Sequence, residues 1–282
     1  MERTAIRLGG GVELSSSVMN ASGPHSAERG EILELSERHH GALVFKSCNI
    51  AGLEAPENLK NRGVEHFAAI ARELAPRRKV IIASVVGSTE DEIARVAAIL
   101  DRAGVKIVEL NLSDDYVMNS VAPFASVGQL KGIIVRVRGE IGAALAVKLP
   151  PRPGAIEPGA IADVFKQTGV AIAVCANDLP KDLEVDIASG RIKGAARPLS
   201  QTHTFWQLAS GTYDVVAVGG VNTGRDAYLA HLTGAKAVGV GSALIKEGAE
   251  ALARIDRELD ALLAANGKRS VDEILGQARF EN

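Results

Sequence analysis

The chain has 282 residues, 46% of them hydrophobic, which is enough for one large α/β domain with a sizeable core. A formal net charge of −2, no basic block and an aromatic content of 4% argue against a nucleic-acid-binding surface. The first residues lack the apolar segment of a secretory signal, and no apolar run approaches the length of a membrane span. We therefore expect a cytoplasmic protein without a membrane partner.

The predicted elements begin with a β-hairpin over residues 4–14, with Gly9–Gly11 as its turn, which we expect to close the bottom of a barrel. Short apolar segments then alternate eight times with segments of helical periodicity. The predicted strands are residues 16–21, 42–47, 79–85, 106–112, 143–148, 171–176, 215–218 and 237–240. The predicted helices are residues 27–38, 64–74, 90–103, 127–139, 158–167, 200–209, 224–232 and 248–265.

This alternation predicts a single (β/α)8 TIM barrel of the α/β class that spans residues 1–282. The strands are rich in Val, without polar alternation, as is typical of strands that are covered on both faces. A long loop, residues 179–199, is inserted before the sixth helix and is predicted to form a small hairpin over the barrel mouth. The two cysteines, Cys48 and Cys175, are in or beside predicted strands, so we expect free buried thiols.

The last two predicted strands end in glycine, at Gly219-Gly220 and at Gly241-Ser242. Glycine lets backbone N–H groups approach an anion, and the positive end of the helix after the first pair points to the same place. In TIM barrels these two loops are the usual phosphate site. We therefore predict a phosphate site here; the alternative is that the glycines only form tight turns.

Two lysines end apolar strands: Lys46 in LVFKS and Lys148 in LAVKLPP. A buried ammonium group is costly unless an anion or a polar ring meets it, so the pair suggests a flat, electron-rich cofactor across the barrel mouth. The alternative is that each lysine extends to solvent. Asn111 and Asn177 offer both donors and acceptors for the edge of an amide ring, or they could satisfy loop backbone groups.

Several segments, in order along nearly the whole chain, resemble the dihydroorotate dehydrogenase family, the FMN-dependent barrels of pyrimidine synthesis. They are VMNASGP from Val18, FKS from Phe45, NLKNRG from Asn58, ELNLS from Glu109, VKLPP from Val147, CAND from Cys175, VGGVNTGRDA from Val218 and GVGSALIKEG from Gly239. As a set they are highly specific, although no single one would be.

The resemblance implies an FMN-dependent oxidoreductase with a small-molecule substrate, a homodimer and no metal. It places the FMN phosphate on Gly219, Gly220, Gly241 and Ser242, and the rest of the cofactor near Ala21, Ser22, Lys46, Asn111 and Lys148. Lys148 would lie beside the N1 and O2 side of the ring and, with Lys46, would take part in catalysis. Asn111, Tyr116, Asn177 and Asp178 would face the substrate.

The chain departs from the family in the loop that carries the catalytic base. Where the family has Cys or Ser, this sequence has Asp114, and Tyr116 replaces a substrate-binding asparagine. A carboxylate can act as a general base, so we expect Asp114 to take the substrate proton. The segment after Lys46 is also shorter than in the family.

Three hypotheses stay open: oxidation of dihydroorotate, oxidation of another ring by the same chemistry, and binding of a phosphorylated ligand without redox chemistry. The sequence does not name the electron acceptor.

Overall fold

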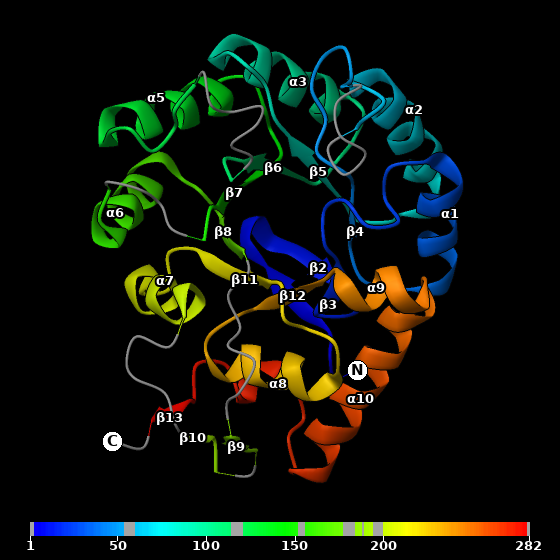
Figure 1. Cartoon of the computed structure of the whole chain (residues 1–282), viewed down its shortest axis with the longest axis vertical. Coiled ribbons are helices and arrows are strands. Elements are labelled where there is room, and N and C mark those ends of the chain that lie inside the picture. Colours follow the sequence, from blue (N-terminus) through cyan, green and yellow to red (C-terminus); the bar gives the residue numbers. More distant parts are fainter. Residues whose placement is uncertain are drawn as a thin grey trace.

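The computed structural model describes residues 3–53, 60–113, 121–151, 156–176, 184–187, 189–193 and 200–280. In this part of the chain, parallel strands form a ring with helices outside it (Figure 1). The ring runs in the order β3 (Val18–Asn20), β12 (Ala237–Val240), β11 (Asp214–Val218), β8 (Ile172–Ala176), β7 (Ala144–Leu149), β6 (Ile107–Asn111), β5 (Ile81–Val85) and β4 (Leu43–Val44). The predicted (β/α)8 TIM barrel is confirmed.

The outer helices follow the predicted alternation. They are α1 (Arg29–Arg38), α2 (Val64–Leu74), α3 (Glu90–Arg102), α5 (Val127–Arg138), α6 (Pro158–Thr168), α7 (Gln201–Ala209), α8 (Gly224–Leu232) and α10 (Glu250–Ala265). Side chains of Thr89, Ser126, Ser200 and Thr223 cap four of them by accepting a backbone N–H, which fixes where these helices begin. A short helix, α9 (Ser242–Glu247), was not predicted, because six residues are too few to show a helical period.

The N-terminal hairpin consists of β1 (Ile6–Leu8) and β2 (Val12–Leu14), joined by a 3-10 turn at Gly9–Gly11. A Cβ atom on Gly9 would overlap the carbonyl of Ala171, and one on Gly10 would overlap the side chain of Ala144. Ala144 and Ala171 lie at the amino ends of β7 and β8. The hairpin therefore packs against the bottom of the barrel, as predicted, and glycine is required for the close approach.

The long loop before the sixth helix, α7, forms a hairpin of β9 (Glu184–Asp186) and β10 (Arg191–Lys193). The prediction that this hairpin covers the barrel mouth is wrong for its described part. β10 pairs in parallel with β13 (Arg279–Phe280), near the end of the chain, and this sheet lies outside the ring beside α8 (Figure 1). Burial of Ile192 and a third strand stabilise this position.

The ring has one seam, between β3 and β4, where no backbone ladder joins the described strands. The side chain of Asn20 takes the place of that ladder. Its Oδ1 accepts the N–H of Val44 at 2.9 Å, and its Nδ2 donates to the carbonyl of Val44 at 2.6 Å. His39 adds a second contact across the seam, because its Nε2 lies 2.6 Å from the carbonyl oxygen of Val18. Side chains of Asn20 and His39 therefore close the barrel.

We predict that Asn20→Ala destabilises the protein by about 3 kcal/mol, because it leaves the buried N–H and C=O of Val44 without partners. Chemical denaturation of both proteins measures the difference in the free energy of unfolding. Asn266→Ala is the matched control, since Asn266 donates to the backbone of Leu262 at 2.8 Å outside the ring. Similar losses for the two variants would show that Asn20 does not hold the seam.

Candidate functional site

The described residues that were predicted to form the site all lie at the carboxyl ends of barrel strands, where TIM barrels carry their sites. Ala21 and Ser22 follow β3, Lys46 follows β4, Asn111 ends β6, Lys148 is in β7, Gly219 and Gly220 follow β11, and Gly241 and Ser242 follow β12. Four other predicted residues, Asp114, Tyr116, Asn177 and Asp178, lie outside the described residues.

The glycines after β11 provide unpaired backbone donors. Gly219 and Gly220 have φ angles of 95° and 82°, a left-handed conformation that favours glycine. Within the described part of the chain, the N–H groups of Gly219, Gly220, Gly241 and Ser242 donate no hydrogen bond. Donors of this kind at two neighbouring strand ends can bind an anion.

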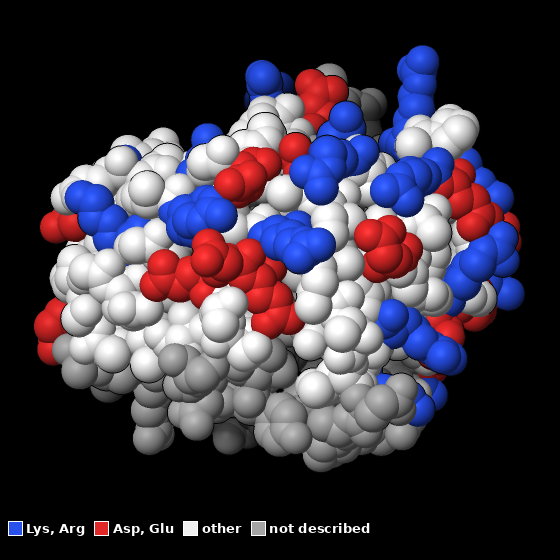
Figure 2. Space-filling view, turned by 90° about the horizontal axis from the view of Figure 1, so that it is seen from above, with Lys and Arg blue, Asp and Glu red and all other residues white. Residues whose placement is uncertain are grey.

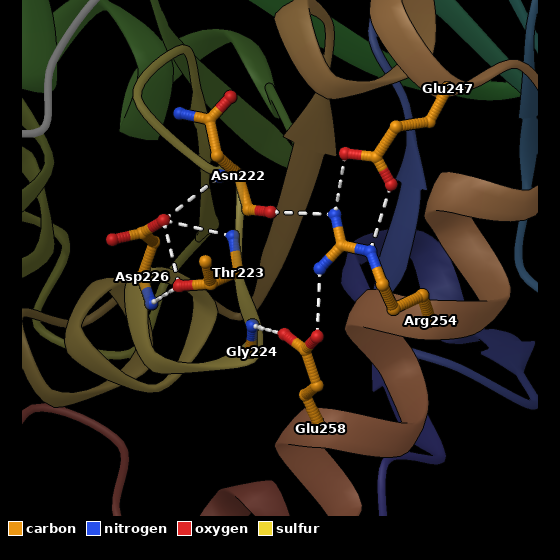
Figure 3. A network of polar contacts seen from close by, with 7 residues as sticks. All are labelled: Asn222, Thr223, Gly224, Asp226, Glu247, Arg254 and Glu258. Carbon is orange, nitrogen blue, oxygen red and sulfur yellow. Dashed lines mark hydrogen bonds and ion pairs between the residues drawn. The ribbon is translucent and has the colours of Figure 1, made fainter.

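The amino end of α8 was predicted to take part in this site. It does not, because carboxylates of the protein already accept its N–H groups. Asp226 accepts the N–H groups of Asn222 and Thr223, both at 2.9 Å, and Glu258 accepts the N–H of Gly224 at 2.7 Å (Figure 3). An anion at the rim would therefore meet the glycine N–H groups and not this helix.

Arg254 of α10 holds the loop after β11 and the helix after β12 together (Figure 3). It donates to Glu247 of α9 at 2.8 and 2.9 Å, to Glu258 at 2.8 Å and to the carbonyl of Asn222 at 2.9 Å. The hydrogen bonds that Arg254 donates to Glu247 and Glu258 raise the pKa of Arg254. Asn222 in turn donates to the carbonyl of Gly220 at 3.2 Å. The two glycine turns are therefore fixed relative to each other.

Hydroxyl groups connect the ends of β3, β4, β5 and β6. Ser22 Oγ lies 3.2 Å from Ser47 Oγ, and Ser47 Oγ lies 2.8 Å from Ser84 Oγ. Ser84 donates to Glu109 Oε1 at 2.7 Å, and Asn111 Nδ2 donates to Ser47 Oγ at 2.9 Å. Glu109 was not among the predicted site residues. The signal was an acidic residue two positions before Asn111 in an otherwise apolar strand, which places both side chains on one face.

The two predicted lysines differ in their surroundings. Lys148 lies directly opposite Asn111 in the β6–β7 register, so the two side chains lie on the same face of the sheet. It is half-buried, and its ammonium group has no hydrogen-bond or ion-pair partner among the described residues. Lys46 is also half-buried, and its backbone N–H donates to the carbonyl of Ser26 at 3.0 Å. A half-buried cation beside an amide suits an anionic or electron-rich ligand.

The outer surface and the thiols provide no second site in the part of the chain that is described. On the face in Figure 2, acidic and basic side chains lie next to one another. Among the ion pairs of the outer helices, Arg136 pairs with Asp91 and Glu140. No cluster of metal-binding residues occurs among the described residues, and none of their helices has the length and apolar character needed to cross a bilayer. Cys48 and Cys175 are buried thiols outside any disulfide, as predicted, and burial raises the pKa of the Cys48 thiol.

Comparisons with known proteins agree with this geometry. A family model described as dihydroorotate dehydrogenase matches residues 55–263. The chain is 26% identical to a putative dihydroorotate dehydrogenase A (fumarate) of Streptococcus equi subsp. equi, with 94% of each chain covered. It is 27% identical to dihydroorotate dehydrogenase (fumarate) of Lachancea kluyveri, covering 92% of this chain and 93% of that relative. A solved ligand-free DHODH of Eimeria tenella has a similar fold, with a TM-score of 0.81, 18% identity, and coverage of 98% of this chain and 92% of that chain.

We predict that Arg254→Met loosens the loop after β11, because the carbonyl of Asn222 and the carboxylate of Glu258 lose their partner. Amide hydrogen exchange at Asn222, Thr223 and Gly224 should become about tenfold faster. Arg269→Met is the control, since Arg269 pairs with Glu273 in another part of the protein. Unchanged exchange in the Arg254 variant would show that Arg254 does not fix this loop.

Proposed function

The chain belongs to the dihydroorotate dehydrogenase family, and from this we propose that it is an FMN-dependent oxidoreductase that oxidises dihydroorotate or a related cyclic amide. The observation that carries the proposal is a set of backbone N–H groups, on the same rim of the barrel as Lys148, that donate no hydrogen bond within the described part of the chain. They belong to Gly219, Gly220, Gly241 and Ser242. A phosphate needs several donors of this kind, and an electron-rich ring needs a nearby cation.

The described residues fit FMN in their chemistry. The glycine N–H groups would hold the phosphate, and a side chain at Gly219 or Gly220 would be strained by the positive φ. Ala21, Ser22, Lys46 and Asn111 would bind the remainder of the cofactor. When bound, FMN supplies the acceptor for the substrate hydride. Lys148 would stabilise negative charge on the cofactor, as a fixed cation in a site shielded from water does efficiently.

Asp114 is the proposed general base, because it occupies the base position of the family motif. It would take the proton from the saturated carbon next to the substrate carbonyl, and Lys46 would support the catalytic geometry. Asn111, Tyr116, Asn177 and Asp178 would orient the substrate ring through hydrogen bonds.

The experiment that tests the proposal is the absorption spectrum of the purified protein, followed by anaerobic addition of dihydroorotate. We expect a yellow protein, or an apoprotein that binds added FMN, and bleaching of the flavin band by the substrate. Fumarate is the first acceptor to test for reoxidation, since it appears in the names of the relatives. A colourless protein that binds no FMN would reject redox chemistry.

We predict that Asp114→Ala slows flavin reduction by about 10²- to 10⁴-fold, the usual contribution of a positioned base, and leaves FMN bound. Stopped-flow absorbance of the reductive half-reaction measures the rate, and the flavin content of the purified variant is the control. Reduction at the wild-type rate would show that another residue is the base.

A second candidate function is oxidation of a ring without the carboxylate, such as a dihydropyrimidine, by the same chemistry. It is favoured by Asp114 and Asp115, which add negative charge where an orotate-like anion would bind, and by Tyr116 in place of asparagine. Parallel assays with dihydroorotate and dihydrouracil separate the two candidates. A phosphate-ligand-binding homologue without redox chemistry would be colourless in both.

The homodimer implied by the resemblance and the cytoplasmic location expected from the sequence are also proposals. Light scattering of the purified protein gives the molar mass, which should be twice that of one chain. Association through one shared surface of both copies would be the expected form, since most small homo-oligomers have two-fold symmetry.

A further inference from the structure

Resting on the proposed function, we propose that Glu109 is a positioning residue that acts through Ser84 and Ser47 to hold the side chain of Asn111 in one orientation. These residues form a chain of hydrogen bonds across three strands, with distances of 2.7, 2.8 and 2.9 Å. Glu109 is 5% exposed and Ser84 is fully buried, so water competes little for the hydrogen bond between them.

The carboxylate of Glu109 determines which atom donates in each hydrogen bond of this series. A carboxylate accepts hydrogen bonds and cannot donate one, so the only hydroxyl hydrogen of Ser84 points to Glu109. Ser84 can then only accept from Ser47, and the hydroxyl hydrogen of Ser47 is used in turn. Ser47 is therefore left with lone pairs on the side where Asn111 Nδ2 donates to it.

Ser22 does not disturb this direction. Its hydroxyl hydrogen is directed to the carbonyl of Phe45, with an O–O distance of 2.9 Å. Its oxygen lies 3.2 Å from Ser47 Oγ, whose own hydrogen is directed to Ser84. Both oxygens can therefore act as acceptors for a ligand at the rim.

The other end of the Asn111 amide is fixed independently. Its Oδ1 accepts from the hydroxyl of Ser113 at 2.6 Å and faces the backbone N–H of Ser113 at 3.3 Å. A flipped amide would place two donors against each other at Ser113 and two acceptors against each other at Ser47. The second N–H of Asn111 has no partner among the described residues, so this orientation leaves one donor for a ligand carbonyl.

The chain of hydrogen bonds also gives a reason for a buried carboxylate in β6. Burying a charged group costs free energy unless hydrogen bonds compensate it, and an apolar residue at the same position would avoid this cost. The carboxylate is therefore expected to have a role that an apolar residue could not fill. Through this chain, the negative charge of Glu109 determines which atoms the protein presents to the cofactor or substrate at Ser47 and Asn111. Glu109 itself touches neither and acts only through its neighbours.

The test uses FMN affinity, measured by quenching of flavin fluorescence on titration of the apoprotein. We expect Glu109→Leu and Ser84→Ala each to raise the Kd for FMN about tenfold, the usual weight of one buried hydrogen bond. In an Asn111→Ala background the same two substitutions should have no further effect, because the group they position is gone. Equal fold-changes in both backgrounds, or none in either, would overturn the proposal.

Ser16→Ala is the matched control. Ser16 is also a buried serine that donates to a carboxylate, Asp256, at 2.6 Å, but it precedes β3 at the opposite end of the barrel. Its FMN affinity should equal that of the wild type. If Ser16→Ala lost as much FMN affinity as Ser84→Ala, removing any buried hydrogen bond of a serine would weaken the site. That result would also overturn the proposal.

A second measurement separates this inference from the proposed function. In the ¹⁵N NMR spectrum of the apoprotein, the side-chain amide of Asn111 is identified by its loss in Asn111→Ala. Ser84→Ala and Glu109→Leu should shift this signal, and Ser16→Ala should leave it in place. If the wild type binds no FMN but the Asn111 signal shifts in Ser84→Ala and Glu109→Leu, the proposed function is wrong and the positioning role of Glu109 is supported. An unchanged signal rejects the positioning role whatever the flavin result.

Discussion

The two hydrogen bonds between the Asn20 side chain and the backbone of Val44 are the constraint on which the site depends. A parallel ring presents all its strand ends at one rim only if its first two strands meet, and here no backbone ladder joins them within the described residues. The hydroxyl of Ser22 also crosses this seam, because it donates to the carbonyl of Phe45 at 2.9 Å. The contacts that close the barrel therefore also hold the ends of β3 and β4 together at the rim.

The rim divides into two halves that are held by different means. Between β3 and β6, serine hydroxyl groups and the buried Glu109 fix the direction of each hydrogen bond. Around β11 and β12, the backbone supplies the donors, and half-exposed charges on α10 hold the turns in place. The first half is suited to recognition of a ring with defined donors and acceptors. The second half is suited to a phosphate, which needs several hydrogen-bond donors and accepts hydrogen bonds from many directions.

Most of the fold could be predicted from the sequence, because strands covered on both faces are short apolar runs. β4 is the exception, since the predicted strand 42–47 extends only over Leu43–Val44. Beyond it, Lys46 donates to Ser26 and Cys48 pairs with Val85, so the chain leaves the regular ladder near the seam. The glycine pairs and the rim lysines could be found from their place at strand ends. Arg254 could not, because charges spaced along a helix usually indicate only a solvated face.

The position of α10 in the chain bears on how the protein is made. Synthesis proceeds from the N-terminus, so both glycine turns are made before Arg254 and Glu258, which hold them. Until then the N–H of Gly224 lacks its carboxylate partner, and the two turns can move independently. A nascent chain with all eight strands but no α10 would thus be a barrel with an unfinished rim. The last long helix, which packs beside β3, therefore completes the rim after all the strands have been made.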